Sequence, residues 1–227
     1  QLMRDSKDFR RGPVPVHRYA ANNTVVYHTK PDSAEFLLEW AALANSRSGE
    51  RGILNLGAMN KHLAPARNWT GEERCNPCGE ALLKPYGLCN LTEVIVRADD
   101  DISDLVEGVR TATWLGVIQS TFPHFPFLRA DWRENCEAER LIGVSLTGQL
   151  DNPDILTPQV LKQLKRVVER TAKHAAKKLG ITTPVAYTLV KPSGTVSSCR
   201  SGKTHPYRWM PFMPSGRGGR VRSTGWT

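Results

Sequence analysis

The chain lacks any long apolar run. None of its 227 residues lies in a stretch approaching the roughly 18 consecutive apolar residues that a membrane-spanning helix needs. The opening segment Gln1 to Asp5 has no feature of a signal peptide. We therefore expect a soluble, cytoplasmic protein with no membrane partner. Because position 1 is Gln rather than Met, we also expect the sequence to begin inside a longer reading frame or to have been trimmed.

Cysteine is scarce, and the number of cysteines is odd. The five cysteines stand at positions 75, 78, 89, 136 and 199. An odd number without a secretory signal argues against a structural disulfide framework and favours redox chemistry or metal binding. The six histidines show neither H-E-x-x-H nor another paired metal-ligand spacing, so we assign no metal site to them.

Acidic residues are absent from the last part of the sequence. Residues 199–227 hold six basic residues and no acid, which leaves only +3 of the net charge of +9 for the first 198 positions. That nearly balanced body suits an enzyme of phosphorylated substrates as well as a nucleic-acid binder. Arg, Gly and Pro dominate after Ser198, and no amphipathic period survives there. We therefore divide the chain into a domain at 1–198 and a basic, irregular tail at 199–227, disordered or out of frame.

Short β-branched runs alternate with helical patterns, which predicts an α/β fold. Strands are expected at 24–27, 53–55, 91–96, 141–147 and 185–190. Helices are expected at 33–45 and 102–119, and a third is capped by Thr157, has Pro158 in its first turn and ends at Gly180. Helices between strands imply parallel neighbours, as in a barrel or an open doubly wound sheet, and periodicity does not choose between the two.

The densest chemical signal is the run Arg74-Cys75-Asn76-Pro77-Cys78-Gly79-Glu80, followed eleven residues after Cys78 by Cys89. These residues lie within a turn that contains Pro and Gly. Such a turn can place Asn76, Cys78 and Glu80 side by side, because alternate residues of an extended segment point the same way. A thiol, a carboxylate and an amide placed in this way could form a site for a sugar. The alternative is a zinc knuckle, in which Cys75, Cys78 and Cys89 are ligands, although no second C-x-x-C follows.

A second signal follows the last expected strand, in the run Lys191-Pro192-Ser193-Gly194-Thr195-Val196-Ser197-Ser198. A glycine among hydroxyl side chains allows the backbone to approach a phosphate closely, although the G-x-x-x-x-G-K spacing is absent and a plain turn would have the same composition. A third run, Glu139 to Gly148, reads by itself as a core strand that ends at a glycine.

Taken together and in this order, these segments resemble the catalytic domain of ribonucleotide reductases. The run Asn76 to Glu80 with Cys89-Asn90-Leu91 is similar to the family's radical-cysteine loop. Arg140 to Gly148 is similar to its R-x-x-G-V-S-x-T-G strand, and Lys191 to Ser198 to its K-P-x-G-T-x-S phosphate loop. Pro77, Gly79 and the Lys-Pro-Ser-Gly-Thr run favour the adenosylcobalamin-dependent class. The resemblance covers Ala21 to Ser198.

The resemblance implies part of a ten-stranded α/β barrel and an oxidoreductase that converts ribonucleoside di- or triphosphates to deoxyribonucleotides. Its cofactor would be adenosylcobalamin, and its reductant a thioredoxin-like protein. By the same resemblance Cys78 would become a thiyl radical that removes the ribose 3′-hydrogen, and Glu80 would take the 3′-hydroxyl proton. Asn76 would hold the ribose hydroxyls, and Cys89 would be one of two reducing thiols. The substrate's phosphates would be bound by Ser193, Gly194, Thr195, Ser197 and Ser198.

The sequence departs from the family in two places. The family's second reducing cysteine lies well upstream of the loop, and no cysteine stands between Gln1 and Arg74. We therefore expect the chain to need missing segments or a second chain that carries the missing barrel half. Beyond Pro206 the family continues with a strand that Tyr207 to Thr227 does not match, which predicts a shifted reading frame or a gene break.

Two other interpretations stay open at this point. One is a zinc-stabilised nucleic-acid-binding module that uses Cys75, Cys78 and Cys89 together with the basic tail. The other is a degenerate chain without activity, because half a barrel leaves strand edges unpaired and apolar helix faces uncovered.

Overall fold

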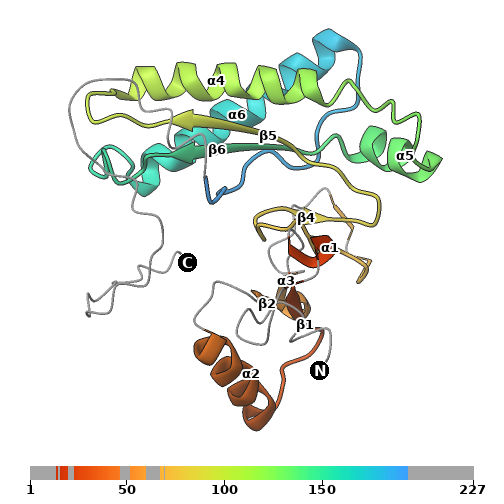
Figure 1. Cartoon of the computed structure of the whole chain (residues 1–227). Helices are drawn as coiled ribbons and strands as arrows, with labels where there is room; N and C mark the ends of the chain where they lie inside the picture. Colours follow the sequence, from red (N-terminus) through yellow and green to blue (C-terminus); the bar gives the residue numbers. More distant parts are fainter. Residues whose placement is uncertain are drawn as a thin grey trace.

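The computed structural model describes residues 14, 16–19, 23–46, 52–59, 67–68 and 70–193 (Figure 1). The elements follow in the order α1 (Val16–Tyr19), β1 (Thr24–Tyr27), α2 (Ser33–Ser46), β2 (Gly52–Asn55), α3 (Leu56–Met59), β3 (Arg74–Cys75), β4 (Leu82–Leu83), β5 (Asn90–Ile95), α4 (Ile102–Gln119), α5 (Ala130–Glu139), β6 (Ile142–Thr147) and α6 (Pro158–Leu179). The predicted α/β class is confirmed, as a partial α/β fold without a closed barrel among these residues. No helix in this part of the chain is long and apolar enough to cross a membrane.

In the described part of the chain, the strands form three two-stranded sheets. β1 pairs with β2 and β5 pairs with β6, both in parallel, as the helices between them predict. β3 and β4 form a short antiparallel hairpin that the sequence patterns do not reveal. The strand expected at 185–190 is present only as a parallel bridge between Val144 and Thr188. The N–H groups of Ile142 and Val144 also donate to the carbonyls of Ala186 and Tyr187, so the segment follows β6 without forming a regular strand.

Helices α4 and α6 pack together and against the β5–β6 sheet (Figure 1). The start of α4 is a capping box, in which Asp101 and Asp104 each accept a hydrogen bond of 2.9 Å from the other's backbone N–H. The start of α6 is capped by Thr157, and the helix ends at Gly180 with φ +67°, both as predicted. The core between these elements is made of Val96, Leu105, Val109, Ala112, Val144, Leu156, Leu164, Val167 and Val168.

Candidate active site

The loop between β3 and β4 is a closed turn. The N–H of Gly79 donates to the carbonyl of Asn76 (2.9 Å), and the N–H of Asn76 donates to the carbonyl of Ala81 (3.0 Å). Pro77 fits the second position of such a turn, and Gly79 has φ +84°, which favours glycine. The run therefore forms a turn, as its Pro and Gly indicate, and the side-by-side placing of Asn76, Cys78 and Glu80 stays a prediction.

The turn gives its three chemical groups different surroundings. The side-chain oxygen of Asn76 accepts a hydrogen bond from the N–H of Ala81 (3.0 Å), so the NH₂ group is the part of this amide that a ligand would meet. Cys78 is exposed at the tip of the turn. Glu80 is half-buried, and both of its carboxylate oxygens are buried without a hydrogen-bond partner in the described part of the chain. An unsatisfied buried carboxylate can accept a hydrogen bond or a proton from a ligand.

Cys89 lies near Glu80 and is less accessible than Cys78. Burial and the negative charge of Glu80 raise the pKa of the Cys89 thiol to about 12, although the positive charge of Arg67 acts in the opposite direction. The thiol is therefore protonated at neutral pH. The structure thus brings Glu80 near Cys89, and Cys78 is exposed on the turn that also carries Glu80.

A cleft of about 480 Å³ lies beside the turn. One side is formed by the first sheet and α3, including Thr24, Asn55 and Met59. The other side is formed by the turn itself, with Pro77, Cys78 and Gly79. Cys78 therefore faces a space large enough for a sugar or part of a cofactor.

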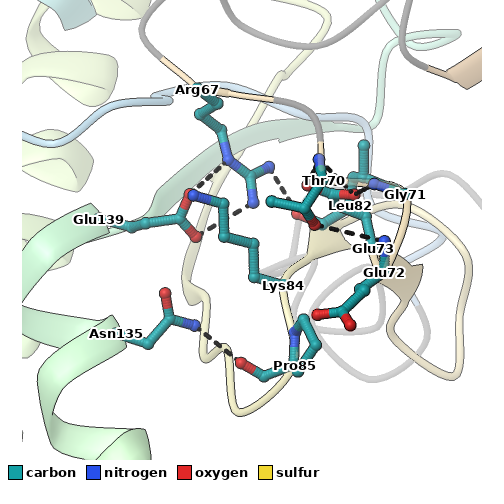
Figure 2. A network of polar contacts seen from close by, with 10 residues as sticks. All are labelled: Arg67, Thr70, Gly71, Glu72, Glu73, Leu82, Lys84, Pro85, Asn135 and Glu139. Carbon is teal, nitrogen blue, oxygen red and sulfur yellow. Dashed lines mark hydrogen bonds and ion pairs between the residues drawn. The ribbon is translucent and has the colours of Figure 1, made fainter.

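A buried ion pair, which we did not predict, supports the hairpin (Figure 2). The Nε of Arg67 lies 2.7 Å from Oε1 of Glu139, and its Nη2 lies 3.1 Å from Oε2. The remaining Nη1 donates to the carbonyl of Leu82 in β4 (2.7 Å), and Nζ of Lys84 lies 3.5 Å from Oε1 of Glu139. The pair therefore ties the segment before the hairpin to β4 and to the last residue of α5.

Glu73 shapes the entry to β3 (Figure 2). It is fully buried, and it accepts hydrogen bonds from the N–H groups of Thr70 (2.9 Å) and Gly71 (2.9 Å). Burial raises the pKa of Glu73, but these hydrogen bonds outweigh burial, so the pKa lies below its ordinary value. Glu73 therefore acts as an ionised acceptor that fixes the bend immediately before the cysteine loop.

The start of the candidate phosphate loop is described as far as Ser193. The hydroxyl of Ser193 donates to Oε2 of Glu93 in β5 (2.8 Å), and Nζ of Lys191 lies 3.5 Å from Oε1 of the same carboxylate. The other four predicted phosphate ligands, Gly194, Thr195, Ser197 and Ser198, lie outside the described residues. The contact with Glu93 was not predicted, although a glutamate inside a β-branched strand is a signal that could have revealed it.

The zinc-knuckle alternative does not agree with this geometry. Cys75, Cys78 and Cys89 are all described, yet no group of three or more Cys, His, Asp or Glu side chains in the described ranges could hold a metal ion.

The candidate site therefore combines an exposed thiol on a turn, a buried carboxylate on the same turn and a second thiol that is protonated at neutral pH. Comparison with known proteins makes this description more specific. No family model matches the chain. Over 80% of its length, however, the chain is 28% identical to the adenosylcobalamin-dependent ribonucleoside-triphosphate reductases of Lactobacillus helveticus and of Lactobacillus leichmannii.

A solved structure supports the same relationship at the level of the fold. The chain superposes on a crystal structure of a B12-dependent (class II) ribonucleotide reductase with a TM-score of 0.61 and 24% identity, over 86% of this chain and 31% of that one. The chain spans about 28% of the length of the curated relatives it matches. These comparisons confirm the resemblance that the motifs indicate. The chain resembles a part of adenosylcobalamin-dependent ribonucleotide reductases.

Proposed function

We propose that the chain is a catalytic segment of an adenosylcobalamin-dependent ribonucleotide reductase, which reduces ribonucleoside di- or triphosphates to deoxyribonucleotides in the cytoplasm. Residues 1–198 would belong to the ten-stranded catalytic barrel, and residues 199–227 would form a separate basic tail. The observation that carries this proposal is that the buried carboxylate of Glu80 lies close enough to Cys89 to raise its pKa, on the same turn that exposes Cys78. The similarity to the Lactobacillus reductases supports it.

The residues present fit the proposed cofactor at one position. A bulky cofactor can reach an exposed thiol on a turn, and Cys78 is such a thiol, whereas Cys89 is half-buried. Thr24, Asn55 and Met59 line the cleft beside Cys78 and would face a group brought there. Adenosylcobalamin, when bound, supplies a carbon-centred radical that can take a hydrogen atom from a thiol.

The chain's own groups then divide the reaction between them. The Cys78 thiyl radical takes the 3′-hydrogen of the ribose and returns a hydrogen atom at the end. Glu80 accepts the 3′-hydroxyl proton with an oxygen that has no hydrogen-bond partner among the described residues, and the NH₂ of Asn76 holds a ribose hydroxyl. Cys89 and a second thiol supply the two hydrogens and two electrons that release the 2′-hydroxyl as water, and the two thiols end as a disulfide.

The second reducing thiol and the reductant are part of the proposal. Residues 1–74 contain no cysteine, so another segment or a second chain would supply the partner of Cys89. A thioredoxin-like protein would then reduce the disulfide. Ser193, Gly194, Thr195, Ser197 and Ser198 would bind the substrate's phosphates, with Ser193 at the end of the segment held by Glu93.

The test is an assay of deoxyribonucleotide formation with adenosylcobalamin, after co-expression of this chain with the flanking coding segments. Cys78→Ser should abolish the activity. Cys75→Ser is the matched control, because Cys75 lies in the same hairpin and has no role in the proposed chemistry, so this variant should keep most of the activity. Equal activity of the two variants would disprove the proposed role of Cys78.

A further inference from the structure

A second turn lies between β4 and Cys89, and one of its residues is strained. The N–H of Gly87 donates to the carbonyl of Lys84 (2.9 Å), with Pro85 and Tyr86 at the two central positions. Tyr86 has φ +60°, and a positive φ at the third position of a turn favours glycine. A tyrosine in this conformation is strained, and such a residue persists only where its surroundings hold it. The contacts of its side chain therefore need an explanation beyond the turn itself.

Two side chains at the start of α5 hold the ring of Tyr86. The guanidinium carbon of Arg129, the residue before α5, lies 5.0 Å from the ring centroid, and its Nη1 donates to the tyrosine hydroxyl (3.1 Å). Trp132 meets the same ring edge-on, with 5.9 Å between the centroids. Tyr86 is 38% exposed, so these contacts rather than burial in the core hold its side chain.

The same face of α5 contacts the rest of the segment that leads to Cys89 (Figure 2). Nδ2 of Asn135 donates to the carbonyl of Pro85 (3.1 Å), and Oε1 of Glu139 lies 3.5 Å from Nζ of Lys84. Residues three and four apart in a helix lie on one face. The residues of α5 and its N-cap that contact positions 84–86 therefore form a single stripe, made of Arg129, Trp132, Asn135 and Glu139.

This stripe reaches the residue before Cys89. Cys136 lies on the same face: burial raises the pKa of its thiol, and a hydrogen bond with the backbone of Leu88 acts in the opposite direction. On the other side of Cys89, the backbone N–H of Asn90 donates a hydrogen bond to the chain just before β6 (3.0 Å). The backbone around Cys89 is thus held by α5 on one side and by the sheet on the other. Because burial and the charge of Glu80 raise the pKa of the Cys89 thiol, its chemistry depends on this placing.

We propose that Tyr86, Trp132 and Asn135 are positioning residues, which hold the segment before Cys89 so that its thiol stays buried near Glu80. This inference rests on the proposed function, because that function makes Cys89 a reducing thiol. The three residues do not touch the substrate in this role. They act through the backbone of residues 84–88 on a thiol that has to stay protonated.

The experiment measures alkylation of each cysteine of the full 227-residue chain by iodoacetamide over a range of pH, with peptide mass spectrometry. Tyr86→Gly removes the ring and relieves the strained backbone. In this variant Cys89 should react at least about tenfold faster at pH 8, and its pH profile should move to lower pH, because alkylation follows the thiolate fraction. Trp132→Ala and Asn135→Ala should act in the same direction, with an increase of about threefold or more.

Two control variants separate this role from general effects on α5. Tyr86→Phe keeps the ring and loses only the hydroxyl, so the rate at Cys89 should stay within about threefold of wild type. Arg133→Ala removes a side chain of the same helix that pairs with Glu137, and it should leave the rate unchanged. Cys78 is already exposed and serves as the internal reference in every variant.

Equal rates at Cys89 in wild type, Tyr86→Gly and Asn135→Ala would overturn the inference. It would also be overturned if the faster reaction came with faster amide exchange throughout α4 and α6, because the change would then be general unfolding. None of these measurements requires turnover. Failure of the proposed function would appear separately, as a co-expressed wild-type chain that forms no deoxyribonucleotide.

Discussion

The buried Arg67–Glu139 pair gives the sharpest prediction about what holds the cysteine hairpin in place. We consider Glu139→Gln, which keeps the size of the side chain and removes its charge. The side chains of Arg67 and Glu139 are 4% and 7% exposed, so the change would leave a guanidinium in the interior without its counter-ion. Lys84, whose Nζ lies 3.5 Å from Oε1, would lose the same partner. Removing one member of a buried pair costs about 3–5 kcal/mol, and we expect that loss in the free energy of unfolding.

Urea denaturation followed by circular dichroism measures this quantity. Glu137→Gln is the control, because it breaks an ion pair to Arg133 in the same helix whose side chains are 62% and 37% exposed, and such pairs contribute below about 1 kcal/mol. A double variant, Arg67→Met with Glu139→Leu, should recover most of the lost stability, since replacing both members by apolar groups is often neutral. The reasoning is refuted if Glu139→Gln and Glu137→Gln cost the same.

Three further predictions concern packing and the thiols. Gly143→Ala should lower the free energy of unfolding by about 1–3 kcal/mol in thermal melts, because its Cβ would lie 2.6 Å from the side chain of Leu189; an unchanged melting temperature would contradict the packing. Iodoacetamide at pH 8 should alkylate Cys78 before Cys89 and Cys136, whose pKa values are raised by burial, and peptide mass spectrometry gives the order. The Cys89 thiol has a pKa of about 12 in the folded chain and an ordinary value of 9.0, so its contribution to stability is complete below pH 9. The free energy of unfolding should therefore fall by about 1.4 kcal/mol per pH unit as the pH rises from 9 toward 12. This fall should be absent in Cys89→Ala.

Local patterns predicted most of the regular elements. The capped helices α4 and α6 and the strand β1 occur at the predicted positions, because caps, glycine stops and apolar periods are properties of neighbouring residues. The hairpin of β3 and β4 escaped prediction because a strand of two residues has no period. The Arg67–Glu139 contact joins residues that are 72 positions apart in the sequence, and the sequence around neither residue indicates such a partner.

The residue types of the candidate site were predicted better than its geometry. Asn76-Pro77-Cys78-Gly79 has the composition of a β-turn, with Asn first, Pro second and Gly fourth, and that signal was available from the sequence. We predicted a turn in this run, but not the exposure of Cys78 or the burial of the Glu80 carboxylate, because both depend on the fold around the turn. The two thiols could not be told apart from the sequence either, because the pKa of Cys89 depends on its burial and on charges brought near it by the fold.

The fold gives Cys78 and Cys89 different chemistry although only eleven residues separate them. Cys78 is exposed on the turn that the hydrogen bond from Gly79 to Asn76 closes. Cys89 directly precedes β5, where both the backbone N–H and the side-chain NH₂ of Asn90 donate to the carbonyl of Leu141 (3.0 Å each). These two hydrogen bonds to Leu141, the residue before β6, hold Cys89 at the sheet, close to Glu80 and Arg67. A thiol that gives up a hydrogen atom to an incoming radical has to be reachable, and a thiol that donates a proton has to stay protonated. For the proposed reaction, the turn of the hairpin keeps Cys78 reachable, and the position beside the sheet keeps Cys89 protonated.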